Sequence, residues 1–249
     1  MSTNVHPTAI VHPEATLEDE VELGPYAVVG KGVHLGPRTR LASHAIVEGP
    51  TRLGEGNVIF PFAVLGCVAQ DKRHAGAPGS LEVGDANVFR EHVTVHRGTG
   101  GRATVIGHHN LLMAGAHAAH DTVLGSHITL ANGVQLAGHA KVGDYATFGG
   151  LSGVAQFVKV GESAFVAAGA MCERDVPPFV VVQGDRARVR ALNRIGLERR
   201  GLDDATIAAL SKAYAAIFGG DRPRAQAIAE LSPGLRANPF VARLIAALA

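Results

Sequence analysis

The sequence has little of what most large globular cores are built from. It contains no Trp, only 5% aromatic residues, and two widely separated cysteines, Cys67 and Cys172. Two distant cysteines make no disulfide framework, and no apolar run approaches the roughly 20 residues that cross a membrane. The first residues show no apolar core of a signal peptide. These absences predict a cytoplasmic protein without an integral membrane segment, built as a repetitive fold of small side chains.

Charge is scarce overall and unevenly spread. The net charge of +1 argues neither for nor against nucleic acid, and no nucleic-acid partner is predicted. Residues 111–155 contain three charged side chains, whereas the equally long window 11–55 contains eleven. The charge-poor window also holds His117, His120 and His139. Histidines in a surface with so few charges suggest a site at a buried interface.

An aliphatic residue recurs at every sixth position. Counted in sixes, the eleven positions from Val5 to Leu65 are all Val, Leu or Ile. The frame breaks at 69–80, slips once at 98–104, and then runs on to Cys172. A period of six fits neither a helix nor an isolated strand, but it is typical of a parallel β-helix built from hexapeptides. Three hexads would make one coil, and about nine coils stacked roughly 4.8 Å apart would rise on the order of 45 Å.

The hexapeptide pattern stops at residues 175–178, where two prolines cannot continue a β-ladder. The sequence therefore predicts a mainly β protein in two parts. Residues 1–178 form the β-helix, with a loop protruding at 69–80, and residues 179–249 form a helical C-terminal domain. Four helices are expected there: Val189 to Arg200, a second capped by Asp203, a third over 222–231, and a fourth opened by Asn238. Six arginines between 185 and 200 would suit a phosphate or an acidic partner.

The coil length places the histidines on one edge of the prism. With 18 residues per coil, His120 lies beneath Gly138, and His139 follows one residue later. His117 belongs to the same coil as His120, and Gln156 continues the column one coil further on. The four polar side chains therefore converge without any helical geometry.

These residue types leave three interpretations open. A histidine beside a carboxylate, as His120 is beside Asp121, suits proton abstraction from a hydroxyl, and the N–H of Gly138 is a candidate oxyanion donor. The same histidines with Asp121 could instead bind Zn²⁺. Because the chain has thirteen histidines, they could also be purely structural.

Six sequence blocks, in order and with matching gaps, make a more specific match. The blocks are AQDKRHAG (69–76), REHVTVHRGT (90–99), NLLMAGAHAAHD (110–121), LAGHAKVGD (136–144), DVPPFVVVQG (175–184) and NRIGLERRG (193–201). Together they resemble the UDP-N-acetylglucosamine O-acyltransferase family, which opens lipid A biosynthesis. The resemblance covers the whole chain and implies a left-handed β-helix that assembles as a homotrimer, with the site between neighbouring prisms.

The resemblance also implies an activity and its catalytic residues. A 3-hydroxyacyl chain would pass from acyl carrier protein to the 3-hydroxyl of UDP-N-acetylglucosamine, with no cofactor and no metal. His120 would be the general base, Asp121 would orient its imidazole, and the N–H of Gly138 would hold the oxyanion.

The remaining residues that the resemblance implicates bind substrate. The sugar and acyl pocket would be lined by Gln70, Asp71, His117 and His139, and Arg73 would also bind substrate. The nucleotide would be held by Gln156, Asn193, Arg199 and Arg200. Ala168 would set the acyl-chain length, leaving room for a fairly long chain.

The chain departs from the family pattern at three places. Ala155 replaces a histidine, Ile195 replaces an acid, and residues 71–74 read Asp-Lys-Arg-His instead of Asp, apolar, Lys, aromatic. These positions would touch donor or nucleotide. N-acylation of the 3-amino analogue of the sugar nucleotide is therefore an alternative, as is a zinc enzyme of carbonic anhydrase type on the same fold.

Overall fold

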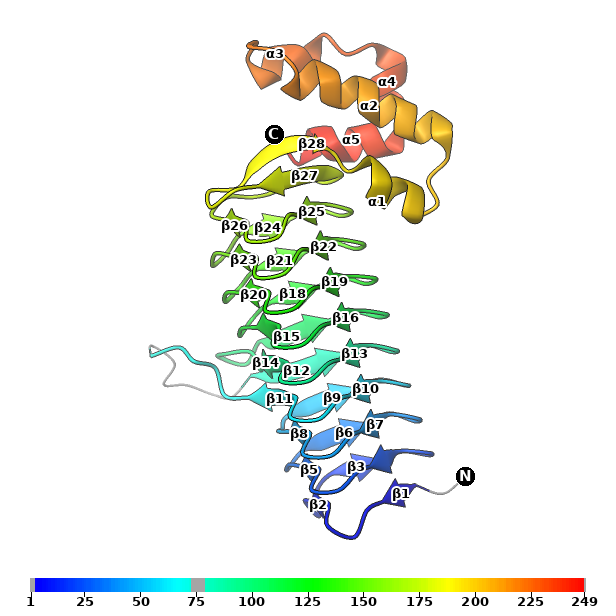
Figure 1. Cartoon of the computed structure of the whole chain (residues 1–249), viewed down its shortest axis with the longest axis vertical. Coiled ribbons are helices and arrows are strands. Elements are labelled where there is room, and N and C mark those ends of the chain that lie inside the picture. The colour runs from blue at the N-terminus through cyan, green and yellow to red at the C-terminus, as the bar shows by residue number, and fades with distance from the viewer. Residues whose placement is uncertain (1–2, 73–78, 249) are drawn as a thin grey trace.

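The chain winds into a three-sided prism that is closed at its C-terminal end by helices (Figure 1). The structure is a computed structural model and describes residues 3–72 and 79–248. Each coil gives one short strand to each of three parallel sheets, here called faces A, B and C. The prediction of a mainly β, left-handed parallel β-helix with C-terminal helices is confirmed.

The strands of each face are given in chain order. Face A contains β1 (Asn4–Val5), β4 (Glu22–Leu23), β7 (Arg40–Leu41), β10 (Val58–Ile59), β13 (Val88–Phe89), β16 (Leu111–Leu112), β19 (Thr129–Leu130), β22 (Thr147–Phe148), β25 (Phe165–Val166), β27 (Val180–Gln183) and β28 (Arg188–Leu192). Face B contains β2 (Ile10–Val11), β5 (Val28–Val29), β8 (Ile46–Val47), β11 (Val64–Cys67), β14 (Thr94–His96), β17 (His117–Ala118), β20 (Gln135–Leu136), β23 (Gly153–Val154) and β26 (Met171–Cys172). Face C contains β3 (Thr16–Leu17), β6 (Val33–Leu35), β9 (Thr51–Leu53), β12 (Ser80–Val83), β15 (Ala103–Ile106), β18 (Val123–Leu124), β21 (Lys141–Val142) and β24 (Lys159–Val160).

The six-residue frame corresponds to the inside of the prism. Parallel pairing sets residues 18 apart side by side, as in Leu112 with Leu130, and both side chains are completely buried. Burial of such a column provides the main apolar stabilisation of the fold. The first coil is the exception, because no coil lies beneath it and Val5 is 40% exposed.

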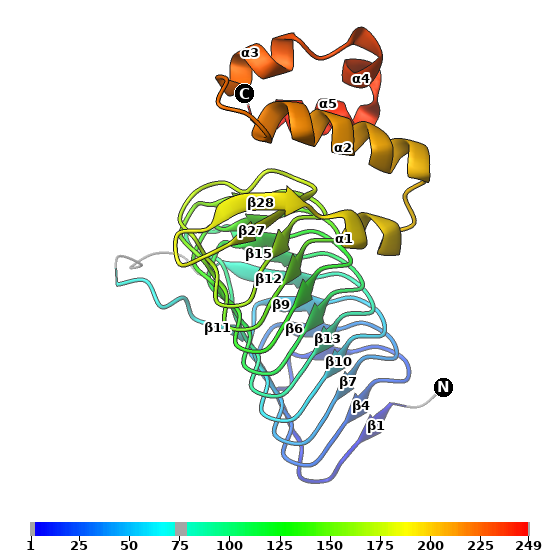
Figure 2. The same cartoon turned by 45° about the horizontal axis from the view of Figure 1, so that its top comes forward.

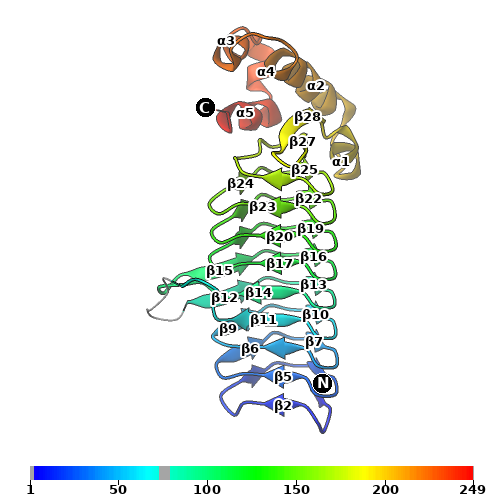
Figure 3. The same ribbon diagram turned by 60° about the vertical axis from the view of Figure 1, so that its left-hand side comes forward.

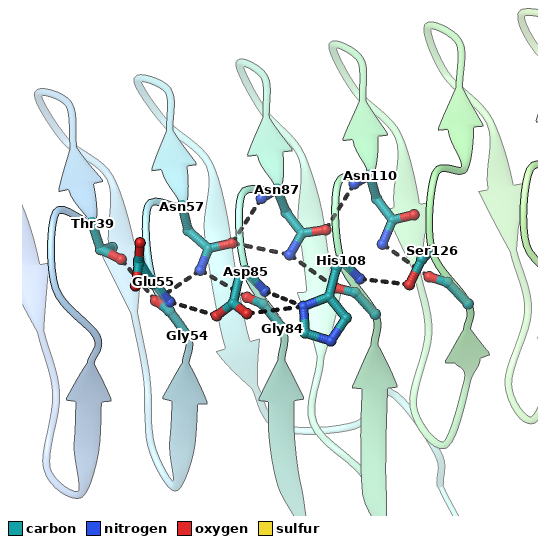
Figure 4. A network of polar contacts seen from close by, with 12 residues as sticks. Thr39, Gly54, Glu55, Asn57, Gly84, Asp85, Asn87, His108, Asn110 and Ser126 are labelled. Carbon is teal, nitrogen blue, oxygen red and sulfur yellow. Dashed lines mark hydrogen bonds and ion pairs between the residues drawn. The ribbon is translucent and has the colours of Figure 1, made fainter.

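A ladder of asparagines runs along the corner between faces C and A (Figure 4). Oδ1 of Asn57 accepts hydrogen bonds from the backbone N and from Nδ2 of Asn87, both at 3.0 Å. Oδ1 of Asn87 in turn accepts from the backbone N of Asn110 at 2.9 Å. All three side chains are at most 1% exposed. The asparagine side chains of the ladder provide hydrogen-bond partners for buried backbone groups of successive coils, which would otherwise be unpaired.

The two interruptions of the frame differ in the structure. Figure 3 shows the chain leaving the stack after β11 and rejoining it with β12. Residues 73–78 of the predicted loop, which include Arg73 and His74, lie outside the described residues. The slip at 98–104 is a turn in which Gly100 and Gly101 have positive φ angles, of 56° and 76°.

The prediction of a helix over Val189–Arg200 is wrong. Residues Arg188–Leu192 form strand β28, antiparallel to β27, and the helix α1 occupies only Arg194–Arg199. The strand covers the last open edge of face A, where β27 would otherwise leave its backbone groups unpaired. Val189 packs against the prism core, and the arginines on either side of it are exposed. This period-two alternation is the signal of a strand.

The C-terminal helices lie across the end of the prism, as Figure 2 shows. They are α2 (Asp204–Phe218), α3 (Arg224–Ala229), α4 (Pro233–Ala237) and α5 (Pro239–Ala246). The predicted caps Asp203 and Asn238 are confirmed, since both side chains accept backbone N–H bonds at helix starts. The short α4 was not predicted, and the predicted helix 222–231 is shorter in the structure. Among the described residues, no helix has the length and apolarity needed to cross a membrane.

Candidate active site

His120 and Asp121 form a buried pair in the turn between β17 and β18, at the corner between faces B and C. Nδ1 of His120 lies 2.8 Å from Oδ2 of Asp121, and both residues are about 5–6% exposed. Asp121 has a positive φ, of 60°, as do His139 and Phe157 at the same corner of the following coils. The repeat therefore supplies the geometry of the pair.

Asp121 is held as an anion by further donors. Its Oδ1 accepts from the backbone N of Thr99 at 3.1 Å and from Nε of Arg102 at 3.2 Å, and its Oδ2 accepts from Oγ1 of Thr99 at 2.7 Å. Burial alone would raise the pKa of Asp121, but the hydrogen bonds from His120, Thr99 and Arg102 outweigh it. They hold the pKa of this carboxyl well below its usual range.

An ionised Asp121 can only accept a hydrogen bond, so the neutral His120 carries its proton on Nδ1. Its Nε2 then presents a lone pair, and no hydrogen bond to this nitrogen occurs among the described residues. Nε2 faces Gly138, where an added Cβ would lie only 2.7 Å away. The N–H of Gly138 also has no hydrogen-bond acceptor in the described part of the chain. A base and an unpaired backbone donor therefore lie next to each other at this corner.

Two further histidines surround the pair. His117 bonds Oγ1 of Thr94 through Nδ1 at 2.7 Å, and burial lowers its pKa. The ring of His139 stands edge-on to that of His120, with centroids 5.2 Å apart. Nε2 of His139 lies 3.6 Å from Oδ2 of Asp121.

Sequence reasoning missed three residues of this cluster. His96 packs edge-on against His117 at 4.9 Å, and burial together with the neighbouring His117 and His120 lowers its pKa to about 4. Its Nδ1 is buried without a hydrogen-bond partner among the described residues. Thr99 and Arg102 come from the turn at 98–104. The slip of the frame was the available signal, because an insertion next to a site can bring in extra donors.

A cleft of about 460 Å³ opens over these histidines on face B. Its wall includes Gln70, His117, His120, Gly138 and Gln156. The structure therefore brings together these five of the predicted site residues.

The remaining residues of the predicted sugar and acyl site are placed less closely. His139 contacts the pair but does not line the cleft. Asp71 directly follows Gln70 and does not line the cleft either. The predicted role of Arg73 lies outside the described residues.

The ligand atoms of His120, Asp121 and His139 lie within 4.8 Å of one another, which is the arrangement required by the zinc alternative. Two contacts oppose a cation there. Asp121 already accepts hydrogen bonds from Thr99 and from the guanidinium of Arg102, and the nearby positive charge would repel a metal ion. The donor set is therefore better suited to acid–base chemistry.

A second cleft, of about 760 Å³, lies where α1 meets face A. It is lined by the predicted nucleotide residues Asn193, Arg199 and Arg200, with Tyr145 and Ile195 beside them. Asn193 is largely committed to structure: its Oδ1 caps α1 at the N of Gly196, and its Nδ2 donates to the carbonyl of Ser163 at 2.8 Å. One amide hydrogen of Asn193 is left for a ligand.

The two clefts lie on different sides of the prism. The histidine cleft is on face B, at its corner with face C, whereas the arginine cleft is on face A, at its corner with face C. Face C separates them within one chain. Ala168 is exposed in the turn between β25 and β26, at the corner of faces A and B, and lines neither cleft. The predicted residues therefore fall on three corners.

Known proteins resemble this chain over nearly its full length. The acyl-[acyl-carrier-protein]–UDP-N-acetylglucosamine O-acyltransferase of Saccharophagus degradans is 44% identical over 248 residues, which are 99% of this chain and 96% of that protein. The protein of the same name from Thermodesulfovibrio yellowstonii is 40% identical, over 97% of this chain and 94% of its own length. A family profile described as "Udp N-acetylglucosamine O-acyltransferase; Domain 2" matches residues 175–249.

The structure of LpxA from Acinetobacter baumannii superimposes with a TM-score of 0.92 at 40% identity, covering 98% of this chain and 96% of that one. A prism of hexapeptide coils with a histidine–carboxylate pair at its corner fits an acyltransferase of the hexapeptide-repeat class. The similarity in sequence and structure identifies a particular family within this class. The chain belongs to the UDP-N-acetylglucosamine O-acyltransferase family. The relatives' names favour neither the zinc alternative nor N-acylation of a 3-amino sugar.

Proposed function

We propose that this protein transfers a 3-hydroxyacyl chain from acyl carrier protein to the 3-hydroxyl of UDP-N-acetylglucosamine, the first step of lipid A biosynthesis. The observation that carries the proposal is the free Nε2 of His120 facing Gly138, with Nδ1 fixed by an anionic Asp121. The relatives named above are acyl-[acyl-carrier-protein]–UDP-N-acetylglucosamine O-acyltransferases by name, which supports the donor and the acceptor sugar. The cytoplasmic location stays a prediction.

The residues of the histidine cleft can perform the reaction in two steps. Nε2 of His120 takes the proton of the sugar 3-hydroxyl as its oxygen attacks the thioester carbonyl carbon. The tetrahedral oxyanion is stabilised by the N–H of Gly138. The intermediate then collapses, the C–S bond breaks, and the thiolate of the carrier's prosthetic arm takes the proton back from His120. Asp121 stabilises the imidazolium in between.

The arginine cleft fits the nucleotide. Arg199 is exposed there, and Arg200 lies beside it, so two guanidinium groups meet the negative charge of a diphosphate. Asn193 has one amide hydrogen left for the nucleotide. Gln156 approaches the substrate from the other cleft. Ile195, which is 63% exposed at this cleft, offers only apolar contact at that position.

We infer that the protein assembles as a homotrimer, and the placement of the two clefts supports this. Because face C separates them in one chain, a substrate that needs both must lie between two copies, with face B of one copy opposite face A of the next. Such a head-to-tail contact gives a closed ring of three copies when each copy is related to the next by a rotation of about 120°. The charge-poor window around His120 would then be an interface.

The test is an acyl-transfer assay with a panel of 3-hydroxyacyl carrier proteins and with UDP-N-acetylglucosamine or its 3-amino analogue. We expect transfer to the hydroxyl sugar, and we expect His120→Ala to lower kcat by about 10³-fold, because a positioned base contributes roughly 10²–10⁴.

His44 provides the control, since it is a histidine at another corner of the prism, stacked between the rings of Tyr26 and Phe62 and outside the histidine cleft. His44→Ala should keep full turnover. Undiminished activity of His120→Ala would contradict the proposal. A preference for the 3-amino sugar nucleotide would show that the assigned acceptor is wrong.

A further inference from the structure

Glu162 lies where the prism, α1 and α5 meet, and two arginines share its carboxylate. Oε2 accepts a hydrogen bond from Nη1 of Arg200 at 2.7 Å, and Oε1 lies 2.9 Å from Nη1 of Arg243. The side chains of Glu162 and Arg200 are only 17% and 15% exposed. Solvent therefore screens this pair less than the exposed ion pairs elsewhere on the surface.

Arg200 is fixed on several sides. Its Nη1 also donates to Oγ of Ser163 at 2.8 Å, and its guanidinium carbon lies 4.3 Å from the ring centre of Tyr145. No hydrogen bond from its Nε or Nη2 occurs among the described residues, although Arg200 lines the arginine cleft. One edge of the guanidinium is thus committed to the protein, and the other remains for a ligand.

Arg243 anchors the opposite side of Glu162. It lies on α5, with its guanidinium carbon 4.3 Å from the ring centre of Phe240, and Phe240 packs against the buried Phe179 at 5.8 Å. Arg243, Glu162 and Arg200 therefore form a continuous chain from the last helix of the protein to the arginine cleft.

We propose that Glu162, held by Arg243, is a positioning residue that orients Arg200 towards the diphosphate of the UDP sugar. The proposal rests on the proposed function. Glu162 has two opposing effects on phosphate binding. Its negative charge weakens the attraction of Arg200 for phosphate. Its hydrogen bond, however, holds the Arg200 side chain in one rotamer, so that less conformational entropy is lost when phosphate binds. Because Glu162 is paired with two cations, its charge is largely neutralised, and the ordering effect dominates.

The test compares Glu162→Ala with Glu162→Gln, which keeps an acceptor oxygen but not the charge. We expect Glu162→Ala to raise the KM for UDP-N-acetylglucosamine about three- to tenfold, with kcat and the KM for acyl carrier protein unchanged. Glu162→Gln should stay near wild type, and Arg243→Ala should raise the same KM about twofold. Arg222→Ala is the matched control, because it removes an exposed Arg–Glu pair beside α3.

Two outcomes would overturn the positioning role. A lower melting temperature with an unchanged KM would make Glu162 purely structural, and a lower KM in both Glu162 variants would show that its charge dominates. Calorimetric titration with UDP separates this proposal from the proposed activity. If wild type binds UDP, and Glu162→Ala binds it more weakly, but wild type transfers no acyl chain, the positioning role stands and the activity is wrong. Absence of UDP binding by wild type would contradict both.

Discussion

The asparagine ladder and the histidine cluster both contain buried polar side chains of one prism, but they use their hydrogen bonds differently. In the ladder, both amide hydrogens of Asn87 are donated, to Asn57 and to the carbonyl of Gly107, and its oxygen accepts from Asn110. In the cluster, Nδ1 of His96 has no hydrogen-bond partner among the described residues. Nε2 of His120 likewise forms no hydrogen bond with any of them.

This difference separates stabilising from reactive polar groups. A fully paired buried network stabilises the fold, whereas each unpaired buried group costs roughly 1–3 kcal/mol. The unpaired nitrogens of His96 and His120 lie beside one cleft, near the corner of faces B and C. Substitutions in the ladder should therefore change stability without changing chemistry, and substitutions of the pair His120 and Asp121 should do the reverse.

Of the variants that compare the two clusters, Asp121→Asn should have the largest effect. A carboxamide can donate to Nδ1 of His120, which favours the tautomer with its proton on Nε2 and removes the base. We expect kcat to fall by about 10²–10³-fold, with the melting temperature changed less than in the ladder variant below. Asp144→Asn is the control, since Asp144 accepts from the backbone N of Ser126 at the next corner. A drop of less than about fivefold would contradict the assigned tautomer.

Asn87→Ala should produce the opposite result. It leaves the backbone N of Asn110 and the carbonyl of Gly107 without their partners, and we expect the free energy of unfolding to fall by about 2–4 kcal/mol. Turnover of the folded protein should be unchanged. Urea denaturation at fixed protein concentration measures the loss, and Asn132→Ala, at an exposed asparagine, should be neutral. A large loss of kcat would show that the two clusters are not independent.

The smallest of these effects is a pH dependence of stability that is caused by His96. Its folded pKa of about 4 lies below the unfolded value near 6.5, so the unfolded state binds more protons between these values. Stability should therefore fall as the pH drops from 6.5 towards 4, by roughly 2–3 kcal/mol from this group, and His117 should act in the same direction. Unfolding of wild type and His96→Asn at pH 7 and pH 5 tests this. Equal pH dependence of the two proteins would contradict it.

The sequence was sufficient for the fold wherever one rule acted alone. The six-residue spacing from Val5 to Cys172 fixed the prism and, through 18-residue coils, the approach of His120 to Gly138. The sequence was insufficient where contacts between distant segments, and not the local residue pattern, determine the secondary structure. Residues 188–192 form a strand because β27 needs a partner, although the segment was predicted to be helical.

The candidate site was also predicted only in part, because some of its residues have no signal in the sequence. Thr99 and Arg102 reach Asp121 through a turn whose course the frame does not specify. His96 has no special signal among thirteen histidines, because only its burial and its neighbours single it out.

The central claim is that one site combines the histidine cleft of one subunit with the arginine cleft of the next. Mixing two inactive variants tests it most directly: His120→Ala lacks the base, and Arg199→Glu reverses the charge that meets the diphosphate. After unfolding and refolding a 1:1 mixture, random assembly should restore about a quarter of the sites, since each site needs one intact residue from each of two neighbours. Recovery of about a quarter of wild-type activity is the predicted result. No recovery, in a mixture shown to contain hybrid trimers, would contradict the account.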